Sequence, residues 1–227
     1  VRCLHSLARR SPRKLLREII LVDNGCEDEK LVEKLSRHVE KRFPKLIKLM
    51  RLQQKLNPVA AKMRAAQKSS FQVLLFVEPL MEVSHNWLPP LLEPIALNPN
   101  ITTYPQLDDI DHKNFSYLKK SIMRLGFSLS LDYSFSFLEN YDQNSSMPHD
   151  NPVMRESIFA MDRDLFWRLG GLDEELYGAE ALEMSFKIWL CGGVLLQVPC
   201  SRVGLITAKK GNVTSESKIL RVSRIRR

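Results

Sequence analysis

An uninterrupted apolar run at 73–77 constrains the fold of this chain more than any other stretch of the sequence. Five consecutive apolar residues are typical of a strand that is buried on both faces, as in a parallel sheet. The run ends on Glu78, and Pro79 follows, so the backbone cannot simply continue there as a central strand. Ligands of open α/β sheets bind beyond the carboxyl ends of the strands, which makes Glu78 a candidate contact for a metal or a nucleotide. The alternative is an ordinary surface carboxylate, since one acidic residue is a weak signal.

The segments before this run alternate between strand and helix patterns. Apolar runs at 18–23 and 46–52 are typical of strands, and apolar residues at helical spacing predict a helix over 27–42. An Asn followed by a Pro predicts that a second helix begins there, over 57–69, with the Asn as its cap. This alternation with short connections favours a doubly wound α/β domain, with a mostly parallel sheet and helices on both faces.

The second half of the chain contains shorter predicted elements and ends in a basic segment. We expect helices at 87–96 and 180–190, a helical turn at 163–169 before two glycines, strands at 101–104, 126–133, 156–161 and 194–198, and a loop at 141–152. The sequence becomes basic and loses its pattern near the end. We therefore predict one domain over 1–205 and a basic tail over 206–227.

The composition and net charge limit the classes of molecule that this protein is expected to bind. The 227 residues suit one domain, and a net charge of +8 would allow binding to nucleic acid or to an anionic membrane. No zinc-finger spacing or RNA-binding aromatic motif accompanies the charge, so we expect a solvated basic surface and no nucleic-acid partner. No stretch reaches the roughly 18 apolar residues of a membrane helix, and we find no signal-peptide pattern at the start. The four cysteines show no C-x-x-C spacing and do not indicate a metal site.

Several motifs carry a resemblance to a known family. They are Ser11–Asp23, Asp162–Phe166, Glu183–Gly193 and Pro199–Gly204, together with the strand that ends at Glu78. The chain resembles, from about residue 5 to about residue 205, the catalytic domain of the polypeptide N-acetylgalactosaminyltransferases. These are retaining Golgi enzymes that transfer GalNAc from UDP-GalNAc to Ser or Thr with Mn²⁺. The resemblance implies a GT-A-like sugar-nucleotide-binding fold. The family's first strand would lie before Val1, so we expect the sheet to lack it and to have an altered edge.

The resemblance also implies that the family's Mn²⁺ site is degraded. In the family an Asp-X-His motif ends the same strand, and a second His follows the Cys-Ser-Arg-Val-Gly run. The corresponding positions here are Glu78, Leu80 and Leu205. Leucine has no lone pair, and apolar groups raise the cost of holding a charge. We therefore expect Glu78 to be the remnant of a metal site that no longer functions, and no bound cofactor.

The nucleotide and catalytic positions are kept in part. By resemblance, Asp23 and Asn24 lie at the uridine-binding position, Lys62 replaces an arginine of the nucleotide site, and Tyr177 replaces a Trp beside it. Lysine is no bidentate replacement for arginine. Glu180 is retained and is the candidate catalytic residue. The alternatives are structural: Asp23 can simply end a strand, and Glu180 can stabilise a helix N-terminus through the helix dipole.

Other family positions are replaced. Ala60 stands where the family has an arginine, and Ala181 stands where it has an asparagine. Met154–Ser157 corresponds to a Met-Ala-Gly-Gly run that lies beside the sugar in the family. Side chains in place of glycines would fill space left for a ligand. In the family, the cysteines that correspond to Cys191 and Cys200 pair with partners outside this span, so these two are expected to be free or paired with each other.

Two functions follow from these changes. The main hypothesis is a catalytically inactive relative that keeps the scaffold, binds UDP or UDP-GalNAc weakly, and acts through a protein partner or has no function after gene decay. The alternative is a divergent Golgi transferase that acts on Ser/Thr-rich proteins with little or no Mn²⁺ dependence. That enzyme would use Asp23, Glu78 and Glu180. Nucleic-acid binding rests on charge alone and is the weakest alternative.

Overall fold

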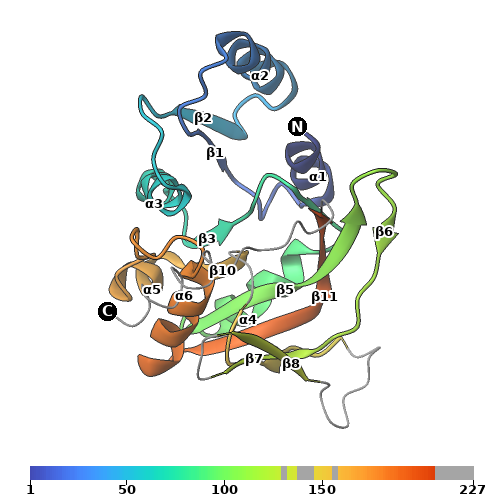
Figure 1. Ribbon diagram of the computed structural model, residues 1–227, viewed down its shortest axis with the longest axis vertical. Helices are drawn as coiled ribbons and strands as arrows, with labels where there is room; N and C mark the ends of the chain where they lie inside the picture. Colours follow the sequence, from blue (N-terminus) through green and yellow to red (C-terminus); the bar gives the residue numbers. More distant parts are fainter. Residues whose placement is uncertain (129–131, 137–145, 155–157, 208–227) are drawn as a thin grey trace.

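The computed structural model describes residues 1–128, 132–136, 146–154 and 158–207 (Figure 1). After α1 (Arg2–Arg10), the chain forms the predicted alternation β1 (Ile19–Asp23), α2 (Glu29–Arg42), β2 (Ile47–Arg51), α3 (Pro58–Lys68) and β3 (Val73–Phe76). β1 and β2 pair in parallel. The side chain of Asn57 caps α3, because its Oδ1 accepts a hydrogen bond from the Ala60 backbone N–H at 2.8 Å. The predicted strands, helices and helix cap of this half are therefore confirmed.

The larger sheet is mixed, so the prediction of a mostly parallel sheet is wrong for this part of the fold. Its strands follow the order β3-β10-β5-β11-β4. β5 (Ile101–Asp111) and β11 (Val194–Thr207) run parallel, whereas β10 (Phe159–Asp162) and β4 (Met81–Val83) run antiparallel to their neighbours. An apolar run indicates burial on both faces of a strand but not the direction of the neighbouring strand. The strand directions therefore could not be predicted from the apolar runs.

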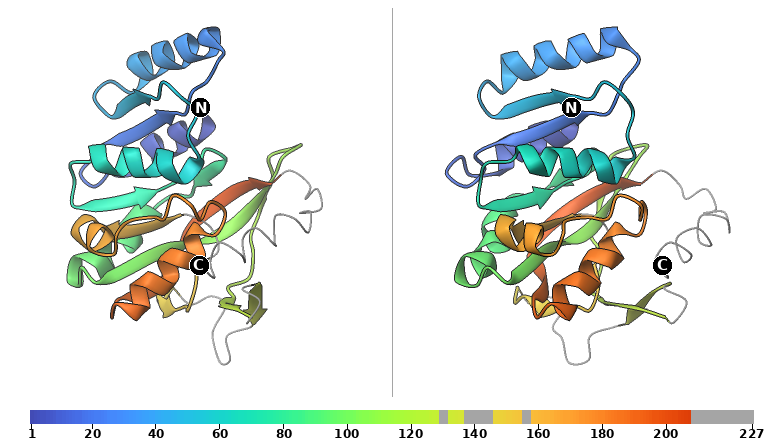
Figure 2. Two further views of the ribbon diagram at one scale, coloured as in Figure 1. Left: turned by 60° about the vertical axis from the view of Figure 1, so that its left-hand side comes forward. Right: turned by 90° about the vertical axis from the view of Figure 1, so that its left-hand side faces the viewer.

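The sheet is interrupted between β1 and β3. β1 and β2 form a separate two-stranded sheet, and β3 ends the described path of the larger one. Two helices join the two parts. α3 packs on β1 and contributes Val59 and Met63 to the core around β3. α1 places Leu4 against β2 and Leu7 against β4. The ribbon views in Figure 2 show α3 between the two-stranded sheet and β3.

Helices cover both faces of the larger sheet, as predicted. Successive residues of β3 point to opposite sides: Leu74 and Phe76 join one core, and Leu75 joins the other. The first core includes side chains from α3, α5 (Arg163–Arg168) and α6 (Glu180–Leu190). The second includes α1 and α4 (Leu88–Leu97). Both faces of the sheet are therefore buried around the end of β3.

Several predicted strands have the wrong extent. β5 and β11 continue well beyond the predicted segments 101–104 and 194–198, and they pair along almost their whole length. The predicted strand at 126–133 is instead a hairpin of β7 (Arg124–Phe127) and β8 (Tyr133–Ser136), and residues 129–131 between them lie outside the described part. Three short strands were missed: β4 (Met81–Val83), β6 (Tyr117–Leu118) and β9 (His149–Asp150), the last within the predicted loop.

The end of the domain lies slightly later than predicted. β11 continues to Thr207, so Ile206 and Thr207 belong to the sheet and not to the tail. Residues 208–227 lie outside the described residues, and the basic tail stays a prediction. All four cysteines are free, so Cys191 and Cys200 do not pair with each other. Among the described helices, none has the length and apolar character that crossing a membrane would require.

A buried polar network connects β9 to the two long strands. Nε2 of His149 lies 3.1 Å from Oε1 of Gln197, and Asn151 donates to the same oxygen at 2.7 Å. Gln197 in turn donates to Oε1 of Gln106 at 2.6 Å. Burial lowers the pKa of His149 below its usual value of 6.5. The folded protein therefore binds a proton at this residue less readily than the unfolded chain does.

We predict that His149 makes the fold less stable under mildly acidic conditions. Because the pKa is lower in the folded state, the unfolded state takes up more protons as the pH falls through about 6.5, and stability falls with it. Urea unfolding of wild type at about pH 7.5 and about pH 5.5 should show this loss, and His149→Gln should reduce it. The exposed His85, changed to Gln, is the control. Equal pH dependence of the His149→Gln variant and wild type would contradict the assignment.

Candidate functional site

Three of the sequence-predicted site residues meet at the carboxyl end of β3. Lys62 lies in the second turn of α3, Glu78 follows β3 by two residues, and Glu180 begins α6. The Lys62 Nζ lies 2.9 Å from Oε1 of Glu78 and 3.5 Å from Oε1 of Glu180. We call these three side chains the Lys62 cluster. One ammonium group therefore joins two carboxylates from different elements.

The Lys62 cluster is shielded unevenly from solvent. The side chains of Glu180 and Lys62 are 8% and 18% exposed, whereas that of Glu78 is 41% exposed. Glu180 also accepts a hydrogen bond at Oε2 from the Gly178 backbone N–H at 2.6 Å, at the positive end of the α6 dipole. A buried carboxylate needs such partners, because an uncompensated charge in the interior is very costly. Glu180 therefore has a structural role in addition to its predicted catalytic one.

Asp23 and Asn24 lie at the end of β1 and shape the loop that follows. Oδ1 of Asp23 accepts the Cys26 backbone N–H at 3.0 Å, and its Oδ2 lies 3.5 Å from Nε of Arg51. The amide of Asn24 donates to the Leu56 carbonyl at 2.8 Å and accepts from the Leu56 N–H at 2.9 Å. Both side chains thus have protein partners in this structure, and their role in nucleotide binding stays a prediction.

The segment before α6 is attached to the start of α3. Asn57 donates from Nδ2 to the Glu174 carbonyl oxygen at 2.8 Å, in addition to capping α3. Gly178 adopts a positive φ of 86°, a conformation that glycine reaches without strain. The side chain of Tyr177 next to it is largely exposed, and its contact with a nucleotide also stays a prediction.

The two leucines at the family's histidine positions lie at the same edge as Glu78. The Glu78 carbonyl accepts the Met81 N–H at 3.1 Å, Met81 is paired with Leu205, and the Leu80 carbonyl accepts the Ile206 N–H at 2.9 Å. The fold therefore brings positions 78, 80 and 205 together, as the resemblance implied. Leu80 is 58% exposed, and Leu205 packs against the apolar core.

These residues do not fit a manganese ion. Mn²⁺ takes carboxylate, imidazole and water ligands, and two of the three positions hold leucine. The remaining carboxylate, Glu78, is already paired with an ammonium group. Within the described ranges, no three His, Cys, Asp or Glu side chains are placed to hold one metal ion.

The other replaced family positions pack into the interior. Ala60 is buried in the first turn of α3, and Ala181 is buried in α6. Met154 is fully buried, and its N–H donates to Oγ of Ser185 at 3.0 Å. Residues 155–157 lie outside the described part, so the predicted filling of the sugar position is untested there.

An ion pair that was not predicted from the sequence joins Asp108 to Arg202, which belongs to one of the family-like motifs. Asp108 is completely buried and accepts two hydrogen bonds from the Arg202 guanidinium, at 2.7 and 2.6 Å. It also accepts the Tyr117 hydroxyl at 2.6 Å and the Lys120 backbone N–H at 2.8 Å. Asp108 is one of three aspartates in β5 and its partner lies 94 positions away, so no local pattern in the sequence marks the pair.

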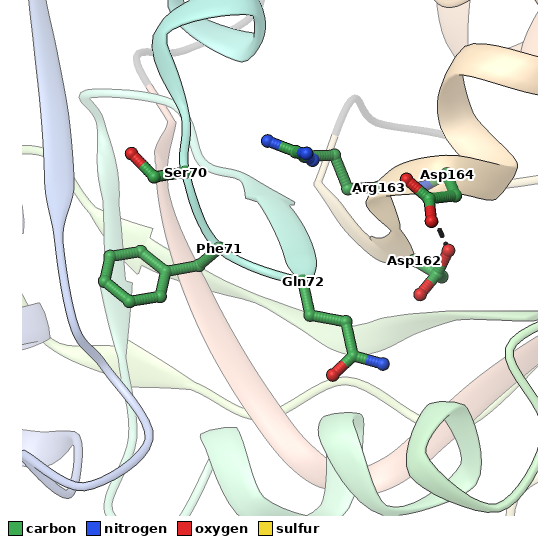
Figure 3. Close-up of a pocket in the computed structure, with 6 residues that line it drawn as sticks. All are labelled: Ser70, Phe71, Gln72, Asp162, Arg163 and Asp164. Carbon is green, nitrogen blue, oxygen red and sulfur yellow. Dashed lines mark hydrogen bonds between the residues drawn. The ribbon is translucent and has the colours of Figure 1, made fainter.

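A cavity of about 260 Å³ lies at the other end of β3 (Figure 3). It is lined by Ser70, Phe71, Gln72, Asp162, Arg163 and Asp164. Two of the polar side chains there have structural partners: Asp162 caps α5, and Arg163 donates to the Ser69 carbonyl at 2.8 Å. Because this cavity lies before β3 and Glu78 lies after it, the cavity is not part of the candidate site.

The fold and the position of this site define a GT-A glycosyltransferase scaffold. Residues 1–170 match the family model described as glycosyl transferase family 2, and the chain belongs to this family. Over 91% of its length it is 42% identical to N-acetylgalactosaminyltransferase 4 of Drosophila melanogaster. It is also 37% identical over 92% of its length to polypeptide N-acetylgalactosaminyltransferase 11 of Xenopus tropicalis. The chain spans about a third of the length of these relatives, covering 33% and 36% of them.

Solved structures give the same assignment of fold. The chain superposes on the crystal structure of GalNAc-T7 with UDP, GalNAc and Mn²⁺ with a TM-score of 0.85. This match has 33% sequence identity and covers 92% of the present chain and 40% of the other. The S. aureus TarS structure matches with a TM-score of 0.63 and 16% identity over 99% of this chain and 36% of that one, which supports the GT-A fold alone.

Proposed function

We propose that this chain is a GT-A domain of the polypeptide N-acetylgalactosaminyltransferase type that has lost sugar transfer. The observation that carries the proposal is the Lys62 cluster, in which the last candidate metal ligand, Glu78, is bound by an ammonium group. The leucines at 80 and 205 support it, since neither can replace an imidazole.

The chemistry of sugar transfer explains why these changes matter. A UDP leaving group carries concentrated negative charge, which a divalent cation stabilises as the glycosidic bond breaks. Even a changed neighbour of a metal ligand costs roughly 10–100-fold in metal affinity or activity. The replacement of two ligands at one site should cost more than that. Turnover with UDP-GalNAc is therefore expected to be absent.

The scaffold itself would carry the remaining function. Asp23 and Glu180 keep buried carboxylates at the ends of β1 and at the start of α6, so weak binding of UDP or UDP-GalNAc is compatible with the site. We propose a protein partner as the main ligand class, and a location in the Golgi or elsewhere in the secretory pathway on the basis of the family.

A divergent active transferase is the second candidate, and one specific observation favours it. The Lys62 ammonium places a positive charge at the end of β3 without any metal. Such a charge could stabilise a diphosphate, although here it already neutralises Glu78. This enzyme would act on Ser/Thr-rich proteins and show little dependence on Mn²⁺.

One experiment separates the two candidates. Thermal unfolding is measured with UDP, with Mn²⁺, and with both, and UDP-GalNAc turnover is measured on a Ser/Thr-rich peptide. A ligand that binds only the folded state adds about 2.7 kcal/mol at about 100 times its dissociation constant. We expect no metal-dependent stabilisation and no turnover. GalNAc-T7, crystallised with UDP and Mn²⁺, is the positive control. Turnover without Mn²⁺ would support the divergent enzyme, and a stabilisation that requires Mn²⁺ would refute the inactive one.

A further inference from the structure

We propose that the Lys62 ammonium is a built-in cation that excludes divalent metal ions from the carboxylates of Glu78 and Glu180. The inference deepens the proposed function and rests on it, because both concern the same site. It goes further by naming the group that keeps the ion out. It also predicts that removing this one positive charge lets the two carboxylates, together with water, bind a divalent ion.

The geometry places Lys62 between two carboxylates that would otherwise face each other. Oε1 of Glu78 and Oε1 of Glu180 approach the same nitrogen, at 2.9 and 3.5 Å. Carboxylate oxygens bind divalent cations at about 2.0 to 2.6 Å, so an ion shared by this pair would need the space that Nζ occupies. The ammonium and a metal ion therefore cannot be bound there together.

Charge reinforces this steric exclusion. With Lys62 in place, the three groups carry two negative charges and one positive charge. A divalent ion that approached Glu78 would meet the ammonium as a like charge. Lys62 is 18% exposed and Glu180 8% exposed, so this repulsion is screened less than it would be on an open surface.

The surroundings fix the backbone at Lys62 and Glu78 and the side chain of Glu180. Lys62 lies on a helix whose start is fixed by the Asn57 cap. The backbone of Glu78 is fixed by the turn to Met81, and Glu180 by its bond to the Gly178 N–H. A fixed backbone reduces the conformational entropy that is lost when the ion pairs form, and this favours the ammonium over a metal ion from solution.

The test measures binding of MnCl₂ alone, without nucleotide, by calorimetry and by the electron paramagnetic resonance signal of free Mn²⁺. Lys62→Met keeps a long helix-forming side chain and removes the charge. We expect saturable binding by Lys62→Met and none by wild type, whose dissociation constant should lie at least about tenfold above that of the variant. Lys62→Arg should resemble wild type, because it keeps the charge. Adding Glu78→Gln to Lys62→Met should abolish the gain.

Lys187→Met is the matched control. Lys187 also pairs with a largely buried glutamate, Glu183, on the same helix as Glu180, so its removal takes a positive charge from a nearby carboxylate but not from Glu78 or Glu180. It should gain no Mn²⁺ binding. Circular dichroism and thermal unfolding check that each variant is folded, and Lys62→Gln replaces Lys62→Met if the latter unfolds.

Two outcomes would overturn the inference. Wild type could bind Mn²⁺ as tightly as the folded Lys62→Met protein, which would show that the ammonium excludes nothing. A folded Lys62→Met or Lys62→Gln variant could also fail to bind, which would show that the two carboxylates do not form a site. Both outcomes are measured by metal binding and not by catalysis. The proposed loss of activity would be refuted by a different result, turnover by wild type, so the two failures can be told apart.

Discussion

Replacement of Asp108 by Ala is expected to lower the free energy of unfolding by about 3–5 kcal/mol, because it leaves the charge of a partly buried guanidinium without its partner. The Asp108 side chain is completely buried, and the Arg202 side chain is 21% exposed. The substitution also removes the acceptor for the Tyr117 hydroxyl, whose pKa is raised by burial and by this hydrogen bond. The three residues join β5, β6 and β11, so the loss is expected to affect the whole sheet.

The neighbouring Asp109 supplies the control for this prediction. It pairs with Lys120 at 2.6 Å, but the two side chains are 30% and 44% exposed. Exposed pairs contribute about 0 to 1 kcal/mol, so Asp109→Ala should change stability by no more than that. Urea unfolding of both variants measures the difference. Equal destabilisation by the two substitutions would show that the buried pair has no special role.

Replacement of Trp87 by Ala is expected to cost about 3–5 kcal/mol, since it removes a large buried aromatic side chain and leaves a cavity. Trp87 is fully buried and packs with Leu7, Met81 and Val83 from α1 and β4. Its indole N–H donates to Oγ of Ser11 at 2.9 Å, which is itself buried. The substitution therefore also leaves a buried hydroxyl without this partner.

Trp189 is the matched control for Trp87. It also donates its indole N–H to a protein acceptor, the Pro152 carbonyl at 2.9 Å, but the residue is 45% exposed. Trp189→Ala should cost clearly less than Trp87→Ala in thermal or urea unfolding. A larger loss for Trp189→Ala would mean that the contact between α6 and the segment before β10 matters more than the core beside α1.

These two predictions concern residues that lie outside the Lys62 cluster. Asp108 and Trp87 lie in the sheet and in the second core, and the Lys62 cluster lies at the end of β3. A chain can therefore keep the GT-A fold while its metal and nucleotide positions change. This separation is the physical reason that family membership by itself does not establish activity.

Local patterns in the sequence predicted much of the first half of the fold. The Asn-Pro start of α3, the strand at β1 and the bounds of α6 at 180–190 are confirmed. Each depends on residues within a few positions of one another, through caps, helical spacing and glycine turns. The candidate positions 78, 80 and 205 were found by resemblance, and the structure brings them to one edge.

Other features depend on partners that are distant in sequence. The sequence pattern predicts a strand only to Tyr104. In the structure β5 continues to Asp111, because Asp108 is neutralised by Arg202 on the neighbouring strand. β4 follows β3 closely in sequence but pairs with β11 at the opposite edge of the sheet. No local pattern in the sequence specifies that β4 pairs at the edge of the sheet opposite to β3.

The sequence by itself determined the family, the alternation of strands and helices, and the loss of imidazole at the positions of Leu80 and Leu205. The tertiary structure alone decided the directions of the strands in the larger sheet and the partners of Lys62, which lie 16 and 118 positions away. Residue identity fixes which chemical groups are present. Where an ammonium group stands relative to two carboxylates is fixed only when a helix, a strand end and a second helix pack against one another.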